Sequence, residues 1–317
     1  MSRFLLTAVA LLASLFSLAQ AARSKEVSSR SGYIPFNYNG EVFQTWYIYY
    51  SKPVVNPLRA RPTIVLHGGP GFTHDYMNPL IDLAKNRPVI LYDQIGNGQS
   101  THLPSKPTSF WSIDLFVAEL ENVIKFFSLK RYDIVGHSWG GMLAGEFAAR
   151  HSMVSRHFGL RRMVLTDSNP QRSLSIQSQA QLLKQFPADV QQEVVTGWKD
   201  PARYRQGLEQ FFHVYGCRLS PWPADLTTSF DALFAEPSVS QQTGITLANW
   251  TVIDRLHKIK VPTLVMNGAH DFIQDFVIQP FLDKLPHVKY HKFENSSHTP
   301  FFEEREEFMS IVGRFLE

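Results

Sequence analysis

Short apolar segments with the character of buried β-strands recur along this chain, and helix-forming segments separate them. The clearest runs are Thr63–Leu66, Val89–Tyr92, Tyr132–Val135, Met163–Thr166 and Thr263–Met266. Most of them are flanked by Pro, Gly or Asp, residues that often end regular structure. Apolar strands that alternate with helices are typical of a parallel sheet covered on both faces. The pattern therefore predicts an α/β fold with a mostly parallel sheet.

One long segment breaks this alternation. Between residues 168 and 254 the β-type runs stop, and the sequence becomes helix-like and rich in aromatic residues. The alternation resumes at Val261, so the segment interrupts one sheet and does not separate two independent domains. We expect residues 168–254 to form a helical cap inserted between two parts of one core, residues 22–167 and 255–317. A length of 317 residues suits one large domain of this kind.

The N-terminus has the pattern of a secretory signal peptide. Arg3 is followed by an apolar stretch from Phe4 to Ala19, and the small residues Ala19 and Ala21 flank Gln20. The apolar stretch is shorter than the about 20 residues that a membrane-spanning helix needs. We therefore expect residues 1–21 to be removed, and the mature protein to be secreted without remaining in a membrane.

The charge and the cysteine content exclude several classes of protein. The chain has 31 basic and 28 acidic side chains and no long basic block, so we do not expect it to bind nucleic acid. Cys217 is the single cysteine, which excludes an intramolecular disulfide. Sequons at Asn249 and Asn295 are candidate glycosylation sites in a eukaryotic secretory route, the second being less favoured because it lies beside His298. The sequence does not predict the oligomeric state.

The segment Gly136-His137-Ser138-Trp139-Gly140 has the pattern of a nucleophile elbow. It follows the strand predicted at Tyr132–Val135 directly and precedes a helical run at Met142–Arg150. In such a strand-to-helix turn the nucleophile adopts a strained conformation, and glycines on either side leave room for it. The motif is short, but its position directly after a strand makes it specific. We therefore expect Ser138 to be the nucleophile of a hydrolase.

A serine nucleophile needs a general base, and that base must itself be oriented by a third group. Asp271 follows a predicted strand, and His298 lies in a loop after the β-like segment Lys289–Phe293. The resulting order of Ser, Asp and His is the order used in α/β hydrolases. Asp275 is the alternative acid. The alternative bases are His270, His287 and His291.

Acyl transfer also needs amide donors for the oxyanion that develops in the transition state. The amide of Trp139, the residue after the nucleophile, supplies the first donor. The segment His67-Gly68-Gly69-Pro70-Gly71 follows the first apolar run, and its glycines allow backbone amides to face a pocket at close range. Gly69 is the first candidate for the second donor, and Gly68 is the alternative. Asp93 also follows a strand, but we interpret it as structural.

Three motifs together resemble the proline iminopeptidase family of α/β hydrolases. They are His67-Gly68-Gly69-Pro70-Gly71, Tyr92-Asp93-Gln94 with Gly96, Gly98 and Ser100, and Gly136-x-Ser138-Trp139-Gly140-Gly141. The segment from Gly71 to Tyr76 and the stretch from Trp250 to Leu264 are similar to the subgroup that contains the tricorn-interacting aminopeptidase. The resemblance covers essentially the whole mature chain. It implies removal of an N-terminal residue, often proline, from short peptides, amides or arylamides, with no metal or organic cofactor.

The chain departs from that subgroup at the positions that hold the substrate ammonium. In the subgroup, glutamates of the cap and of a loop bind this group, and one of them directly follows the catalytic aspartate; here that position is Phe272. Glu236 is the only acidic residue near the equivalent cap position. An unpaired ammonium in an aromatic pocket is costly, so a free-amine substrate would need acidic partners. We expect Phe272, Trp250 and Glu236 to contact the substrate, with Asp231 and Asp275 as further acidic candidates.

These observations leave three functions open. The family motifs favour an aminopeptidase or amidase that acts on small peptides or amides. Phe272 and the aromatic cap favour an esterase or lactonase that acts on a small neutral metabolite. The remote alternative is a ligand-binding protein that has lost its chemistry. Dehalogenases and epoxide hydrolases expect an aspartate at the elbow, so Ser138 disfavours both.

Overall fold

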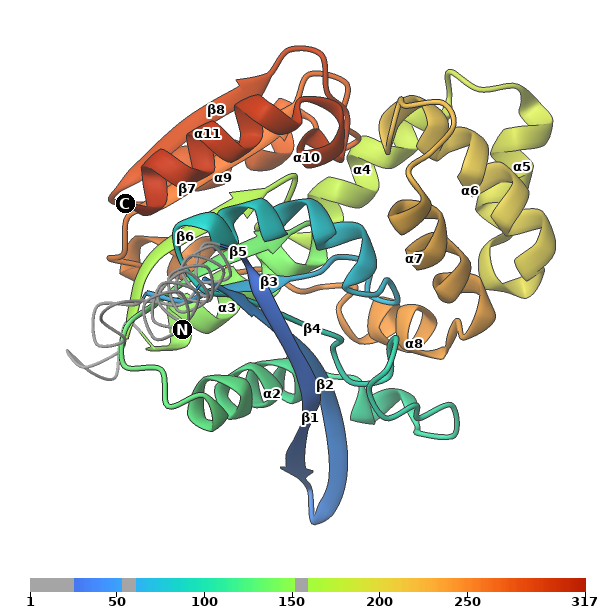
Figure 1. The fold of residues 1–317 in the computed structure, drawn as a ribbon. Helices are drawn as coiled ribbons and strands as arrows, with labels where there is room; N and C mark the ends of the chain where they lie inside the picture. The colour runs from blue at the N-terminus through green and yellow to red at the C-terminus, as the bar shows by residue number, and fades with distance from the viewer. Residues whose placement is uncertain (1–25, 53–60, 152–158) are drawn as a thin grey trace, which may run out of the picture.

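An eight-stranded sheet organises the computed structural model, which describes residues 26–52, 61–151 and 159–317. The predicted signal peptide, residues 1–21, lies outside these ranges. The strand order is β1-β2-β4-β3-β5-β6-β7-β8 (Figure 1); β1–β2 and β2–β4 pair antiparallel, and the other neighbours pair parallel. The mostly parallel sheet predicted from the sequence is therefore confirmed. The strands are β1 (Ser28–Tyr38), β2 (Glu41–Ser51), β3 (Thr63–Leu66), β4 (Val89–Tyr92), β5 (Tyr132–His137), β6 (Leu160–Thr166), β7 (Thr263–Gly268) and β8 (Val288–Phe293).

Helices cover both faces of this sheet. The helices α2 (Ile113–Phe126), α3 (Trp139–His151) and α9 (Asp275–Lys284) contribute to one hydrophobic cluster, whereas η2 (Asp75–Lys85) and α11 (Arg305–Leu316) contribute to the other. Successive residues of the central strands alternate between the two clusters, as the two-residue period of a strand requires. Burial on both faces explains why these strands are apolar throughout. Within the described ranges, no helix has the length and apolar character needed to cross a membrane.

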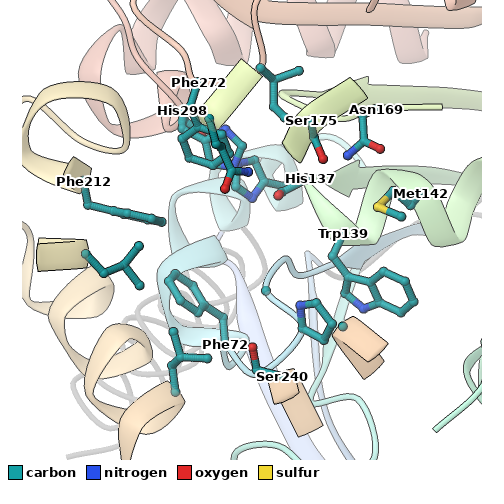
Figure 2. Close-up of a pocket in the computed structure, with 18 of the residues that line it drawn as sticks. Phe72, His137, Trp139, Met142, Asn169, Ser175, Phe212, Ser240, Phe272 and His298 are labelled. Atoms are coloured by element: carbon teal, nitrogen blue, oxygen red, sulfur yellow. The ribbon is translucent and has the colours of Figure 1, made fainter. Parts of the chain in front are cut away.

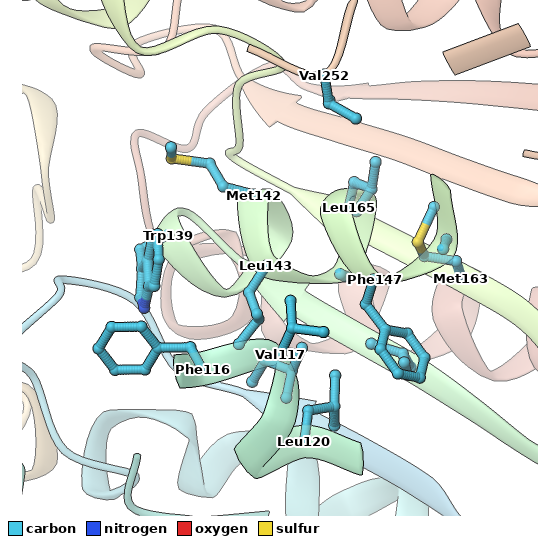
Figure 3. Packing of buried hydrophobic residues seen from close by; sticks show 14 of the residues in the cluster. Phe116, Val117, Leu120, Trp139, Met142, Leu143, Phe147, Met163, Leu165 and Val252 are labelled. Carbon is cyan, nitrogen blue, oxygen red and sulfur yellow. The ribbon is translucent and has the colours of Figure 1, made fainter. Parts of the chain in front are cut away.

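The helix α3, whose N-terminus adjoins the elbow, is held by close packing against α2. Ser112 caps α2 by accepting a hydrogen bond from the backbone N of Leu115 at 3.4 Å. Figure 3 shows Phe116 of α2 close to the indole of Trp139, with Leu143 of α3 above the α2 side chains. This packing holds the N-terminus of α3, and with it the position of Ser138.

A group of helices, which we call the cap, is inserted between β6 and β7. It consists of α4 (Arg172–Leu183), α5 (Ala188–Thr196), η4 (Gly197–Lys199), α6 (Pro201–Tyr215), α7 (Ala224–Ala235) and α8 (Ser238–Thr246). In Figure 1, α5, α6 and α7 lie together to one side of the sheet. An antiparallel bridge between Gln171 and Thr251 joins the two ends of the cap. The remaining short helices are η3 (Thr108–Phe110), η5 (Ile253–Lys258) and α10 (Pro300–Glu303).

The hairpin of β1 and β2 was not predicted from the apolar runs. Each strand has 11 residues, and most side chains of β1 are exposed, so β1 has no continuous apolar segment, whereas β2 contains the run Trp46-Tyr47-Ile48-Tyr49-Tyr50. The turn between the strands is Asn39-Gly40, with φ values of 50° and 81°. An Asn-Gly pair with both residues at positive φ is typical of a two-residue type I′ hairpin turn. The Asn-Gly turn and the aromatic run of β2 were therefore the signals that could have predicted this hairpin.

Candidate active site

Ser138 stands at the turn between β5 and α3. Its φ of 53° lies in the left-handed region, which residues other than glycine seldom adopt. Its backbone N donates to the carbonyl of Thr166 at 3.0 Å, and its own carbonyl accepts from the backbone N of Gly141 at 2.9 Å. A Cβ atom on Gly136 or Gly140 would collide with neighbouring backbone. The glycines therefore permit the elbow, and the surrounding hydrogen bonds hold Ser138 in its strained conformation.

The structure brings Asp271 and His298 together. Asp271 lies in the loop after β7 and His298 in the loop after β8, and each is 3% exposed. Nδ1 of His298 lies 2.7 Å from Oδ1 of Asp271, and this oxygen also accepts a hydrogen bond from the backbone N of Ile273 at 2.8 Å. Because the carboxylate accepts a hydrogen bond from Nδ1–H, the proton of the neutral ring stays on Nδ1 and Nε2 remains available as a base. Ser138 and His298 line the same cavity.

The alternative acid and bases lie elsewhere. Asp275 is exposed and forms an ion pair with Lys292 at 2.8 Å. His270 and His287 are exposed, and His291 lies 3.2 Å from Glu307. The remaining candidate, Asp93, is fully buried and accepts hydrogen bonds from the backbone N and from Nδ1 of His74, at 2.8 and 2.9 Å. These contacts give Asp93 the structural role that we predicted.

The loop after β3 provides the candidate oxyanion donor. Gly69, at a φ of 110°, lines the cavity together with Ser138 and Trp139. Trp139 is the first residue of α3, where backbone amides have no partner within the helix. The amide of Gly68 instead donates to the hydroxyl of Tyr76 at 2.5 Å. Gly69 and Trp139 are therefore the better placed pair, and Gly68 is engaged in a structural contact.

A chain of hydrogen bonds connects this loop to the loop of the candidate base. The hydroxyl of Tyr76 lies 2.7 Å from Nδ1 of His137, and Nε2 of His137 lies 2.7 Å from the carbonyl of His298. Burial lowers the pKa of His137 well below its usual value, so the ring is neutral. It accepts from Tyr76 through Nδ1 and donates to His298 through Nε2. Neither a role for Tyr76 nor one for His137 was predicted from the sequence, although His137 occupies the variable position of the elbow motif.

A second carboxyl group lies beside the Asp271–His298 pair and was also not singled out from the sequence. Asp167 directly follows β6 and is fully buried. Polar atoms of Asp167, Asp271 and His298 all lie within 4.8 Å of one another. Burial, and then the negative charge of Asp271, raises the pKa of Asp167 well above its usual range. Oδ2 of Asp271 has no hydrogen-bond partner among the described residues, so it is the acceptor that a protonated Asp167 carboxyl would use.

The cavity beside Ser138 is small, and a large part of its wall is apolar. Its volume is about 150 Å³. Aromatic and aliphatic side chains from the core loops and from the cap form one part of its wall: Phe72, Leu208, Phe212, Leu226, Leu233, Leu247 and Phe272. Figure 2 shows the three phenylalanines of this set. The ring of Phe272 lies 3.9 Å from that of His298, centroid to centroid. No aspartate or glutamate of the described chain lines this cavity.

Of the three predicted substrate contacts, only Phe272 lines the cavity. The indole N of Trp250 donates to Glu146 at 2.9 Å, so Trp250 supports the core at the cap junction. Glu236 forms an ion pair with His102 away from the cavity. Of the further acidic candidates, Asp231 pairs with Arg205. The sequence placed these residues near the cap but could not predict which way their side chains point.

The two sequons lie on exposed asparagines. Asn249 is exposed in the segment that leaves the cap. Asn295 is also exposed, but its side-chain amide donates to Glu304 at 3.3 Å, and its backbone N donates to the same carboxylate at 3.1 Å. Glycosylation at either position stays a prediction.

Comparison with known proteins agrees with this geometry. The family model described as the alpha/beta hydrolase fold matches residues 62–305. The proline iminopeptidase of Clostridioides difficile (strain 630) is 30% identical over 305 residues, which cover 90% of this chain and 97% of the relative. The solved structure of the proline iminopeptidase of Mycobacterium smegmatis is 35% identical with a TM-score of 0.78, covering 90% of this chain and 97% of that one. The structure of VinJ is also 35% identical, with a TM-score of 0.81 and coverage of 90% and 98%. The chain therefore belongs to the α/β-hydrolase family, as one of its proline iminopeptidase-like hydrolases.

Proposed function

We propose that this hydrolase cleaves amide or peptide bonds of small substrates, as an aminopeptidase or amidase, with Ser138 as nucleophile, His298 as base and Asp271 as the group that orients the base. The observation that carries the proposal is the buried hydrogen bond of 2.7 Å between His298 and Asp271, in a structure where His298 and the strained Ser138 line one cavity. The similarity to proline iminopeptidases supports an amide or peptide substrate.

The proposed reaction begins when Nε2 of His298 takes the proton of Ser138 as Oγ attacks the substrate carbonyl. The amides of Gly69 and Trp139 stabilise the resulting oxyanion, and Asp271 stabilises the imidazolium. His298 then protonates the leaving amine, the C–N bond breaks, and an acyl-enzyme remains on Ser138. Finally, His298 removes a proton from water as the water attacks the ester, and it returns a proton to Ser138 when the acid leaves.

One observation favours a second candidate, an esterase or lactonase that acts on a small metabolite. A free N-terminal ammonium needs acidic partners in an apolar pocket. None of the described residues that line the cavity is an aspartate or glutamate. An ester or a blocked amide would not carry the unpaired positive charge. Loss of catalysis is disfavoured as a third candidate, because the strained elbow and the buried His–Asp pair would then have no use.

The test compares wild type with Ser138→Ala on matched proline and alanine arylamides, their N-acetylated forms and short-chain nitrophenyl esters. We expect Ser138→Ala to lose a factor of about 10⁴ or more in kcat on every substrate that wild type cleaves, because an alanine cannot form the acyl-enzyme. A variant that keeps more than about a tenth of the activity would contradict the proposed mechanism. Cleavage of free-amine amides alone would support the aminopeptidase. Cleavage of esters or acetylated amides alone would support the second candidate.

The proposal also includes export of the protein after removal of residues 1–21. It is supported by the charged start, the apolar stretch and the small residues around Gln20. Mass spectrometry of protein collected from the culture medium should find an N-terminus at Ala22. Retention of residues 1–21 in all of the protein, or its absence from the medium, would contradict export.

A further inference from the structure

Among the described residues that line the cavity, Arg172 alone carries a permanent charge. Arg172, the first residue of α4, lines the cavity together with Ser138. Its Nη1 donates to Oγ of Ser175 at 3.2 Å, and it forms no ion pair with any carboxylate of the described chain. Burial lowers the pKa of Arg172, but a guanidinium keeps its proton at neutral pH. The substrate site therefore holds a cation without a counter-charge.

Other partly buried arginines in this protein differ from Arg172 in this respect. Nη2 of Arg161 lies 2.7 Å from a carboxylate oxygen of Asp133. Nη1 of Arg255 lies 2.7 Å from Glu146. A guanidinium that is withdrawn from water is stable only when an anion or several acceptors replace its hydration. The position of Arg172 is therefore that of a group whose anionic partner is supplied from outside the chain.

Further polar groups surround Arg172 on the same part of the cavity wall. Asn169 lines the cavity, and its Oδ1 is buried without a hydrogen-bond partner. Tyr204 also lines the cavity, and its electrostatic neighbour is Arg172. Figure 2 shows Asn169 and Ser175 on one side of the pocket, whereas Phe72 lies on the other. The wall therefore has a polar, positively charged part and an apolar part, which suits an amphipathic ligand with one negative group.

We propose that the substrates of this enzyme carry a carboxylate that forms an ion pair with Arg172. A carboxylate matches the planar fork of a guanidinium and can accept two parallel hydrogen bonds from it. The inference deepens the proposed function and rests on it, because the same molecule must present an amide or ester carbonyl to Ser138. Two classes fit: a half-amide or half-ester of a dicarboxylic acid, with the carboxylate on the acyl side, and a short peptide with a free C-terminus, with the carboxylate on the leaving group. A substrate that carries an ammonium and no carboxylate on either side of the scissile bond would be repelled by Arg172.

Two matched substrate pairs test this assignment. The acyl-side pair is the para-nitrophenyl half-ester of glutaric acid and para-nitrophenyl pentanoate; the leaving-group pair is alanyl-leucine and alanyl-leucinamide. We expect wild type to prefer the charged member of one pair by about tenfold or more in kcat/KM, because the neutral member leaves Arg172 unpaired. Arg172→Gln should reduce that preference to less than about twofold while it retains cleavage of the neutral member. The pair that responds identifies the side of the scissile bond on which the carboxylate lies.

Arg205→Gln is the matched control. Arg205 also belongs to the cap and pairs with Asp231, but it does not line the cavity, so the variant makes the same change in net charge away from the site. It should keep the preference of wild type. If Arg172→Gln and Arg205→Gln lose the preference equally, the net charge of the protein and not an ion pair with Arg172 causes the preference for the charged substrate. A preference that survives in Arg172→Gln would overturn the assignment to Arg172.

A binding measurement separates this inference from the proposed function. Titration calorimetry with glutarate, and with pentanamide as the neutral comparison, needs no turnover and can use Ser138→Ala. If glutarate binds Ser138→Ala but not the double variant with Arg172→Gln, the inference holds even where none of the assayed bonds is cleaved, and only the proposed function fails. If neutral substrates are cleaved in a Ser138-dependent manner without a preference for charge, and glutarate does not bind, the inference fails and the proposed function stands.

Discussion

The core wall and the cap wall of the cavity differ in how their polar groups are satisfied. On the core side, hydrogen bonds run without interruption from the amide of Gly68 through Tyr76 and His137 to the carbonyl of His298. Each donor in this series of hydrogen bonds has an acceptor, although the four residues lie in different segments of the sequence. The loops after β3, β5 and β8 are thereby fixed relative to one another before any substrate binds.

The cap wall, with which we group Asn169 because it lies just before α4, has the opposite character. Arg172 has no carboxylate partner, and Oδ1 of Asn169 and Oγ1 of Thr243 are buried without a hydrogen-bond partner among the described residues. All three line the cavity. Groups that act on every substrate must be held in place before the substrate binds. Groups that select a substrate can lack a partner within the protein, because the correct substrate provides that partner when it binds. This difference supports our proposal that the core residues carry out the reaction and that the cap residues select the substrate.

The largest expected effect tests the core side of this comparison. Asp271→Asn should reduce kcat/KM by a factor of about 10³ to 10⁴, because an amide can no longer hold His298 in the tautomer that a base requires. The measurement is steady-state kinetics on the best substrate from the panel described above. Asp275→Asn is the matched control: Asp275 is exposed and pairs with Lys292, so its loss should change kcat/KM by less than about twofold. Equal effects of the two substitutions would invalidate the assignment of Asp271.

An intermediate effect should follow from interrupting the hydrogen-bond chain. Tyr76→Phe removes the acceptor of the Gly68 amide and the donor to His137, so both become unsatisfied in a buried site. We expect a loss of about 1 to 3 kcal/mol in the free energy of unfolding and a fall of about tenfold in kcat, with KM little changed. Urea denaturation and steady-state kinetics measure the two quantities.

Tyr92→Phe provides the contrast for Tyr76→Phe. Tyr92 is as deeply buried as Tyr76, but its hydroxyl has no hydrogen-bond partner among the described residues. Its removal should leave stability unchanged or increase it slightly, because an unpaired polar group is replaced by an apolar one. If the two substitutions were equally destabilising, packing and not the hydrogen-bond chain would account for the loss.

The substitution with the smallest expected effect on catalysis changes stability alone, and it concerns a carboxyl group that has hydrogen-bond partners but no opposite charge beside it. The Glu119 carboxyl accepts hydrogen bonds from Thr45 Oγ1 at 2.5 Å and from the backbone N of Ile95 at 3.0 Å. Burial raises the pKa of Glu119 from 4.5 to about 8. The folded state therefore keeps a proton that the unfolded state loses, so wild-type stability should fall as pH rises from about 4.5 through about 8.

Glu119→Gln cannot ionise and should lack this fall. Between pH 5 and pH 8, the difference in free energy of unfolding should move in favour of the variant by about 2 to 4 kcal/mol. Urea denaturation at the two pH values measures it. Parallel pH profiles for the two proteins would mean that Glu119 titrates normally. The result would show whether hydrogen bonds alone can stabilise a buried carboxylate, or whether it also needs an opposite charge nearby.

The sequence predicted the parts of the fold in which one physical signal dominates. Strands buried on both faces are apolar throughout, so the runs at Thr63–Leu66 and Val89–Tyr92 coincide with β3 and β4. The elbow glycines have a local steric reason, and Ser138 indeed adopts a positive φ. The order of Asp271 and His298 along the chain follows from the order of the strands. Their contact of 2.7 Å agrees with that reasoning, while their catalytic roles stay predictions.

What could not be predicted depends on contacts between distant segments. The hydroxyl of Tyr76 meets His137 across 61 positions of the sequence, and no local pattern signals such a contact. Trp250 and Glu236 were placed near the substrate because they belong to the cap region, but the direction of a side chain on a helix or turn depends on how the cap packs. Asp167 was detectable in principle, since it directly follows a buried strand, as Asp93 does.

The bridge between Gln171 and Thr251 has a consequence for how such enzymes can diversify. At this seam, the backbone N of Arg172 donates to Trp250 at 3.1 Å, and that of Val252 donates to Pro170 at 2.9 Å, so the insertion leaves and re-enters the core at one pinned point. The cost of closing a loop grows only slowly with its length. Segments of different length and sequence can therefore be exchanged above the seam without disturbing the register of the sheet. The sheet and its loops can therefore stay constant while the inserted segment varies.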